Sequence, residues 1–210
     1  MPDTGSFFPH LTYWIDKTGV LFMNDIVARL DALREKLSDE AFLTNKGLSN
    51  EVGLYIFAYK PAEEMAVRCF IRGLMEKQNA GGLHCRIKQF DLYEIMLDIC
   101  REKRILERVP QMEKQRGQDF IMKQIQKLAP PEAYVAHMKY DGHQRGDVVF
   151  ITGVGRVYPY MRSHNILNNL QHVFDDVPVV MFYPGEYTGQ SLTLFGRFFD
   201  DNYYRAFNLI

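Results

Sequence analysis

The sequence has 210 residues, and at about 150 residues per domain this length allows one large domain or two small ones, with ample chain for a sizeable core. Hydrophobic residues make up 47% of it and charged residues 24%, which excludes intrinsic disorder. Lys and Arg total 25 against 26 Asp and Glu, and the formal net charge of -1 excludes a protein that attracts nucleic acid over its whole surface. No apolar run approaches the ~20 residues of a membrane span, so a membrane protein is excluded too.

The cysteines are spaced too far apart for a disulfide framework or a zinc site. Cys69, Cys85 and Cys100 contain no CxxC pair, and their number is odd. We therefore expect all three to be small apolar core residues of a protein in the reducing cytoplasm.

Residues 1–22 form a segment with two alternative interpretations. Asp16 and Lys17 interrupt its apolar residues, which is not typical of a signal peptide. A helix is predicted to begin at Met23 and Asn24, with Asn24 as its cap. The segment is then either an upstream extension, with Met23 as the natural start, or an arm that docks through Trp14.

The remaining sequence alternates between helical and strand patterns. Helices are predicted over 24–37, 61–79, from Asp91, over 158–174 with Pro159 in the first turn, and over 197–207. Asp91 and Glu94 resemble a capping box, so Asp91 is the predicted cap of the third helix. Strands are predicted over 52–59, 83–88, 147–152, 177–183 and 191–195, the fourth ended by a turn at Pro184-Gly185. Residues 83–88 alternate between apolar and polar, which indicates an edge strand. The order predicts an α/β fold: a mixed or mostly parallel sheet flanked by helices on both faces, with a helical insertion around 91–139.

A glycine-containing turn after the strand at 147–152 is the best candidate for a cofactor site. Gly153, Gly155 and Arg156 follow a strand and precede a helix, which is the arrangement that seats a phosphate. However, Tyr158 occupies the place of the third glycine of a dinucleotide fingerprint, and no GK[ST] follows. A plain strand-to-helix turn is favoured, and a degenerate nucleotide-binding domain is the alternative.

The predicted helix after this turn is rich in polar residues, namely Arg162, His164, Asn165, Asn168, Asn169 and His172. The last four of these lie at i, i+3, i+4 and i+7 and so share a face that could bind a ligand. Amides are poor metal ligands and no carboxylate joins the histidines, so we expect no metal site. The sequence also lacks a GxSxG elbow and a partnered acid and base. It therefore predicts a binding protein without catalytic residues or a cofactor.

Residues 101–127 are the one strongly basic stretch, with eight Lys or Arg against four Asp or Glu. This pattern predicts either the solvated faces of helices or a patch that binds DNA or an acidic partner. No aromatic stacking platform is interleaved with the charges, so the first interpretation is favoured.

Several motifs together resemble one family. They are Lys46-Gly47-Leu48-Ser49-Asn50-Glu51-Val52-Gly53, Tyr55-Ile56-Phe57, Thr152-Gly153-Val154-Gly155, Tyr158-Pro159, Arg162-Ser163-His164, Ile166-Leu167-Asn168-Asn169-Leu170-Gln171, Val179-Val180-Met181-Phe182-Tyr183-Pro184-Gly185, Gly189-Gln190-Ser191-Leu192 and Asp200-Asp201-Asn202-Tyr203-Tyr204-Arg205-Ala206-Phe207. They resemble the BrxB family of bacteriophage exclusion (BREX) defence systems. The resemblance covers residues 23–210 as a single α/β domain and leaves residues 1–22 outside.

The resemblance implies a role in a system of several proteins that methylates host DNA and blocks phage replication. It implies no catalytic residues. It also implies that the protein binds another BREX component, of which a PglZ-like protein is the expected partner and others are possible. Contact with DNA is expected to be weak or indirect. The aromatic and arginine-rich C-terminal third suits such a partner surface. The residues expected in it are Arg197, Phe198, Phe199, Tyr203, Tyr204 and Arg205.

Overall fold

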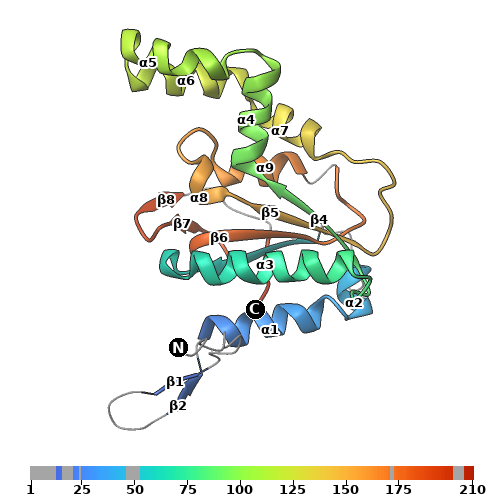
Figure 1. Ribbon diagram of the computed structural model, residues 1–210. Coiled ribbons are helices and arrows are strands. Elements are labelled where there is room, and N and C mark those ends of the chain that lie inside the picture. The colour runs from blue at the N-terminus through green and yellow to red at the C-terminus, as the bar shows by residue number, and fades with distance from the viewer. Residues whose placement is uncertain (1–12, 16–20, 24, 46–52, 171–172, 201–205) are drawn as a thin grey trace, which may run out of the picture.

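The fold is built on a sheet of parallel strands. The computed structural model describes residues 13–15, 21–23, 25–45, 53–170, 173–200 and 206–210. The strands β3 (Leu54–Tyr59), β4 (Arg86–Asp91), β5 (Asp147–Thr152), β6 (Val179–Tyr187) and β9 (Phe207–Asn208) run parallel in the order β4-β5-β6-β3-β9 (Figure 1). Two short antiparallel strands, β7 (Leu192–Leu194) and β8 (Phe198–Asp200), continue the sheet from the end of β6. A separate hairpin pairs β1 (Tyr13–Ile15) with β2 (Leu21–Met23).

The burial of each strand follows from its place in the sheet. Every residue of β5 is buried, as expected of an inner parallel strand with both faces covered. β4 lies at the edge, as its alternating pattern predicts, although it begins three residues later than predicted. The prediction of a mostly parallel sheet is therefore confirmed.

Helices cover both faces of this sheet (Figure 1). One face packs against α1 (Asp25–Lys36) and α3 (Glu64–Asn79), which follows η1 (Pro61–Glu63); α2 (Glu40–Leu43) adds Phe42 to the same core. The other face packs against α4 (Leu92–Glu102), α7 (Pro131–Met138), α8 (Val154–Val157) and α9 (Ser163–Leu170). Two separate apolar cores result, one on each side of the sheet.

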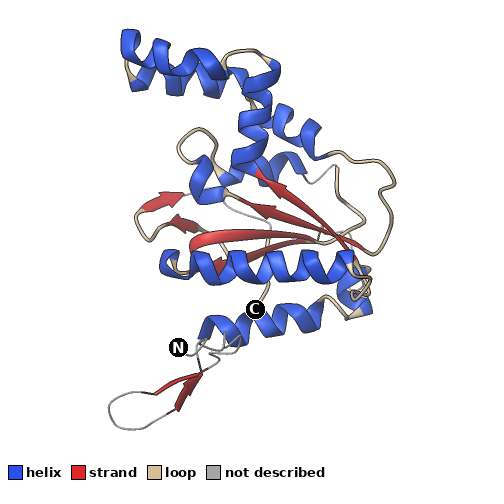
Figure 2. Ribbon diagram, in the orientation of Figure 1, coloured by secondary structure: helices blue, strands red, loops and turns tan. Residues whose placement is uncertain are grey.

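The predicted helical insertion is confirmed, and part of it projects from the body. Between β4 and β5 the chain forms α4, η2 (Leu106–Arg108), α5 (Val109–Arg116), α6 (Gln118–Leu128) and α7. Gly117 joins α5 to α6 with a φ of +83°, a conformation that favours glycine. Figure 2 shows these two helices side by side at the far end of α4, away from the sheet.

An ion pair with a buried carboxylate joins the two outermost strands on the β4 side. Asp147 on β5 is fully buried and lies opposite Arg86 on β4. Its carboxylate accepts hydrogen bonds from Arg86 Nε (2.8 Å) and Nη2 (2.6 Å), the Tyr140 hydroxyl (2.8 Å) and the Gln144 amide (3.3 Å). Burial alone would raise the pKa of Asp147, but these donors outweigh it and hold that pKa below its ordinary value.

Two predicted helices are wrong. The helix predicted over 158–174 is interrupted, because Tyr158 is extended, as a residue before proline prefers, and α9 begins only at Ser163. The helix predicted over 197–207 is replaced at Phe198–Asp200 by β8, which a turn at Gly196 brings back onto β7. Pairing with a neighbouring strand overrides the local pattern there.

Two smaller predictions are also corrected. Pro184 and Gly185 do not end β6, which continues to Tyr187; a Cβ on Gly185 would lie 2.1 Å from the Thr193 carbonyl oxygen, so glycine permits the close pairing with β7. Cys85 and Cys100 are buried, but Cys69 is exposed on α3. The predicted cap Asn24 lies outside the described residues.

Candidate functional site

Polar side chains replace apolar ones where β4 and β5 end. On the face covered by α3, Ile87 is followed along β4 by Gln89 and Asp91, and Phe150 is followed along β5 by Thr152. The chain leaves β3 toward one face and leaves β4 and β5 toward the other, an arrangement that opens a crevice beyond strand ends. The crevice here has a volume of about 280 Å³ and lies between these side chains and α3. We call it the strand-end cleft.

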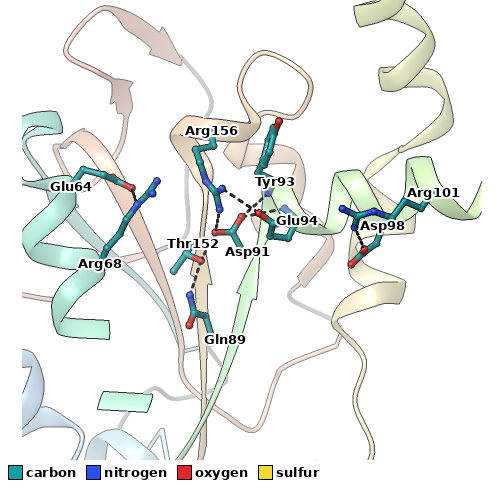
Figure 3. Close-up of polar contacts among 10 residues, drawn as sticks. All are labelled: Glu64, Arg68, Gln89, Asp91, Tyr93, Glu94, Asp98, Arg101, Thr152 and Arg156. Atoms are coloured by element: carbon teal, nitrogen blue, oxygen red, sulfur yellow. Dashed lines mark hydrogen bonds and ion pairs between the residues drawn. The ribbon is translucent and has the colours of Figure 1, made fainter. Parts of the chain in front are cut away.

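Asp91 is the centre of a hydrogen-bond network on one wall of the strand-end cleft (Figure 3). Its Oδ1 accepts from the amides of Tyr93 (3.0 Å) and Glu94 (3.3 Å), which confirms Asp91 as the cap of α4. Its Oδ2 accepts from Thr152 Oγ1 (3.2 Å) and Arg156 Nη2 (2.6 Å). One carboxylate thus joins α4, β5 and α8.

Arg156 spans the gap between α8 and the start of α4. It donates to Glu94 Oε1 (3.2 Å) as well as to Asp91, and its guanidinium lies 5.1 Å from the centre of the Tyr93 ring. Partial burial by itself would lower the pKa of Arg156. The hydrogen bonds and negative charges of Asp91 and Glu94 outweigh this effect and raise that pKa above its ordinary value. This arginine is therefore held as a permanent cation by the protein's own carboxylates.

The two glycines of the predicted cofactor turn allow neighbouring side chains to pack closely against the backbone. Gly153 has a φ of +76°, and a Cβ there would lie 2.2 Å from Asp91 Oδ1. A Cβ on Gly155 would lie 2.8 Å from the Phe195 ring. The Asp91 carboxylate thus fills the space next to Gly153 that a phosphate would need, so the geometry gives the nucleotide-binding alternative no support.

The opposite wall of the strand-end cleft comes from α3. The Tyr59 hydroxyl donates to Glu64 Oε2 (2.5 Å), and Arg68 Nε donates to Glu64 Oε1 (2.7 Å). Burial, followed by the bond to Glu64, raises the pKa of Tyr59, so its hydroxyl stays a donor. Arg72 lies one turn further along α3, and the apolar residues of the cleft are Val67, Ile71, Met75 and Phe182.

A second cavity gathers residues that were predicted for a partner surface. It has a volume of about 230 Å³ and is lined by Tyr158, Met161, Arg162, Ser163, Tyr183, Arg197, Phe198, Phe199 and Asp200. Phe198 is 45% exposed and Phe199 60% exposed. With Met65 on α3, at 66%, they are the large apolar side chains exposed in the described part of the chain. We call this cavity the aromatic hollow.

The aromatic hollow is held in place by contacts between β8 and its neighbours. The centres of the Phe198 and Tyr158 rings lie 4.8 Å apart, and His164 Nδ1 on α9 lies 2.7 Å from Asp200 Oδ2. The structure therefore brings together Arg197, Phe198 and Phe199. The other expected partner residues, Tyr203, Tyr204 and Arg205, lie outside the described residues.

The polar residues predicted to share a face of α9 make contacts in different places and do not form one site. Arg162 lines the aromatic hollow and His164 contacts β8. Asn169 donates to the Asn165 carbonyl oxygen of its own helix, and Asn168 is exposed. His172 lies outside the described residues. Neither the strand-end cleft nor the aromatic hollow is lined by these asparagines.

The basic stretch forms a third cavity where α4 leads into α5. It has a volume of about 520 Å³ and is lined by Arg101, Arg104, Leu106, Glu107 and Arg108. Arg101 also pairs with Asp98 at 2.5 Å along α4. We call this cavity the basic hollow; it brings together three of the arginines predicted to form a patch.

Among the described residues, no three His, Cys, Asp or Glu side chains gather as metal ligands would. No helix among them is long and apolar enough to cross a membrane.

The sequence did not identify the strand-end cleft as a site, although it gave Asp91 a role as a helix cap. The signal that was available is the change from apolar to polar residues on one face of β4 and β5, at Gln89, Asp91 and Thr152. It is visible only when the strands are aligned, with Asp91 opposite Thr152.

These features define an open α/β protein with a polar cleft at its strand ends and an exposed aromatic surface on a small hairpin. The family profile "BREX protein BrxB" matches residues 88–209. A BREX protein BrxB of Bacillus cereus (strain H3081.97) is 48% identical over 90% of this chain and 99% of its own length. Another, from Escherichia coli O9:H4 (strain HS), is 32% identical over 87% of this chain and 90% of its own length. The chain belongs to the BrxB family, as its motifs predicted, and no solved structure matches it.

Proposed function

We propose that this chain is a non-enzymatic component of BREX antiphage defence and acts in the cytoplasm as an adaptor. It docks to another BREX protein, with a PglZ-like protein as the first candidate, and so contributes to host DNA methylation and phage exclusion. The relatives named BREX protein BrxB support the system to which it is assigned. The adaptor role rests on the chain's own surface.

The exposure of Phe198 and Phe199 is the observation that carries the adaptor role. Aromatic side chains beside arginines are favoured anchors of protein interfaces, because they bury a large area at a small cost in conformational entropy. Here both rings border the aromatic hollow, together with Arg162 and Arg197. Phe199 is 60% exposed, so its ring adds little to the stability of the free protein and much area to a complex.

Replacing Phe199 by alanine is expected to weaken docking without unfolding the protein. The tagged chain is co-expressed with the other proteins of its system, purified, and passed through size exclusion, and the stoichiometric partner is identified by mass spectrometry. We expect a PglZ-like protein to co-elute, and Phe199→Ala to weaken that complex by roughly 2 kcal/mol, or about 30-fold. Thermal unfolding of the free variant is expected to match that of the unchanged chain.

Met65→Ala is the matched control, because Met65 is an equally exposed apolar residue on the other side of the sheet. It should leave the complex intact. Elution of the unchanged chain without a partner would overturn the adaptor role. A complex that tolerates Phe199→Ala would remove the aromatic hollow from the interface.

DNA binding through the basic hollow is a second candidate function. The fold gathers Arg101, Arg104 and Arg108 around one cavity beside a projecting helical hairpin. If phosphates bind there, affinity for duplex DNA falls steeply with salt, because each contact releases condensed counterions.

Charge reversal tests this second function. Arg104→Glu combined with Arg108→Glu is expected to weaken DNA binding and to reduce the slope of log K against log salt by about 2. The control, Arg34→Glu with Lys36→Glu, makes the same change in charge on α1. Binding that is absent, insensitive to salt, or equally weakened by both pairs contradicts this function.

A further inference from the structure

The strand-end cleft combines apolar and polar lining residues, which is typical of sites for small organic molecules. Val67, Ile71 and Met75 of α3 and Phe182 of β6 supply its apolar surface. Gln89, Asp91 and Thr152 lie opposite, at the ends of β4 and β5. Open parallel sheets bind their ligands in this position, beyond the carboxyl ends of the strands.

The carboxylates of the strand-end cleft are already saturated. Asp91 accepts four hydrogen bonds, two on each oxygen. Both oxygens of Glu64 are occupied, one by Tyr59 and one by Arg68. These acidic groups are therefore neutralised within the protein and offer little to a cationic ligand.

The guanidinium groups of α3, in contrast, have donors to spare. Among the contacts of the described residues, Arg68 uses only its Nε, toward Glu64. Arg72 makes one long contact, from Nη2 to the Cys69 sulfur at 3.6 Å. These two arginines lie at i and i+4, on the same face of the helix. Together they contribute several N–H groups to the lining of the cleft.

We propose that the strand-end cleft binds a small organic oxyanion, a carboxylate or a phosphate ester, with its charged group on Arg72 and the free N–H groups of Arg68. A guanidinium pairs with either group through two parallel hydrogen bonds. The apolar part of the ligand lies against Val67, Ile71 and Met75. This binding activity goes beyond the adaptor role, and it uses residues other than those of the aromatic hollow.

The test is a titration of the 15N-labelled full chain followed through the arginine Nε–Hε signals. Three probes share a ring and differ in charge: phenyl phosphate, benzoate and the neutral benzyl alcohol, each at millimolar concentration and constant ionic strength. We expect saturable shifts of the Arg72 signal, which is assigned by its loss in Arg72→Gln, with at least one of the two anions. Which anion binds more tightly separates a phosphate ligand from a carboxylate ligand.

Variants decide whether the cleft is the site. Arg72→Gln is expected to weaken anion binding by roughly tenfold, the loss of one charge-assisted pair. Arg34→Gln removes another exposed arginine, on α1, and should change nothing. The proposal is overturned if neither anion gives a saturable shift, if benzyl alcohol binds as tightly as the anions, or if Arg72→Gln leaves the affinity unchanged.

Discussion

Asp147→Ala is expected to lower the free energy of unfolding by about 3 kcal/mol, because it removes a buried carboxylate that accepts charged and neutral hydrogen bonds. Asp147 is fully buried, and four donors point at its carboxylate. Alanine leaves the Tyr140 hydroxyl and the Gln144 amide without their acceptor and removes the ion pair between β4 and β5, which stay joined by their backbone pairing. The Arg86 side chain is 34% exposed, so water compensates in part for its lost partner.

Chemical denaturation measures this effect, with Asp98→Ala as the matched control. Asp98 also pairs with an arginine, Arg101, but both side chains are 54% exposed, and a change of less than about 0.5 kcal/mol is expected. Equal losses from Asp147→Ala and Asp98→Ala would show that burial of the Asp147 pair contributes nothing.

The same carboxylate predicts how stability depends on pH. The pKa of Asp147 is lower in the folded protein than its ordinary value of 3.8. Its contribution is therefore complete above pH 3.8 and is lost as the pH falls further, through the folded pKa. Denaturation at a series of pH values gives the free energy of unfolding of the unchanged chain and of Asp147→Asn. The difference between these two free energies should become smaller only in the acidic range. A difference that stays constant there contradicts the lowered pKa.

Gly153→Ala is expected to cost about 3 kcal/mol of stability, from two sources: a left-handed backbone, at about 1 kcal/mol, and steric overlap. Its φ is +76°, and the new Cβ would lie 2.2 Å from Asp91 Oδ1. The Asp91 side chain cannot move away freely, because it caps α4 and binds Arg156. The substitution therefore strains the backbone and disturbs the network of the strand-end cleft together.

Gly81→Ala separates these two effects. Gly81 has nearly the same φ, +72°, and nothing lies within 4 Å of a Cβ there, so only the backbone cost remains. Denaturation should show a larger loss of stability for Gly153→Ala than for Gly81→Ala. In a chain that already carries Asp91→Ala, Gly153→Ala should cost no more than Gly81→Ala does. Equal costs for the two glycine variants would mean that Asp91 moves aside without penalty.

The sequence predicts most of the sheet, because inner parallel strands form continuous apolar runs. Residues 147–152 were predicted as a strand with the bounds that the structure gives to β5. It fails where long-range pairing decides. Phe198 to Asp200 fit a helical pattern, yet they pair with β7, and no local signal indicates that partner.

In the candidate sites, too, local features were predicted and long-range contacts were not. Phe198 and Phe199 were expected at a surface from their type and neighbours, and they are exposed. Gly153 was expected at a tight turn, but the reason for a glycine there, the Asp91 carboxylate, comes from a residue sixty-two positions earlier in the chain. A site assembled from the ends of several strands is therefore recognised only after the strands have been placed.

The place of β3 in the sheet has a consequence for how the protein folds. β3 is the first of the parallel strands in the chain, yet it lies between β6 and β9, and Leu54 pairs with Val179, more than a hundred positions later. Such pairing requires closure of a very long loop, which slows folding and favours late docking of the strand. During synthesis, β3 therefore lacks its neighbours in the sheet until most of the chain has been made, and over that interval its apolar side chains and unpaired edges favour aggregation.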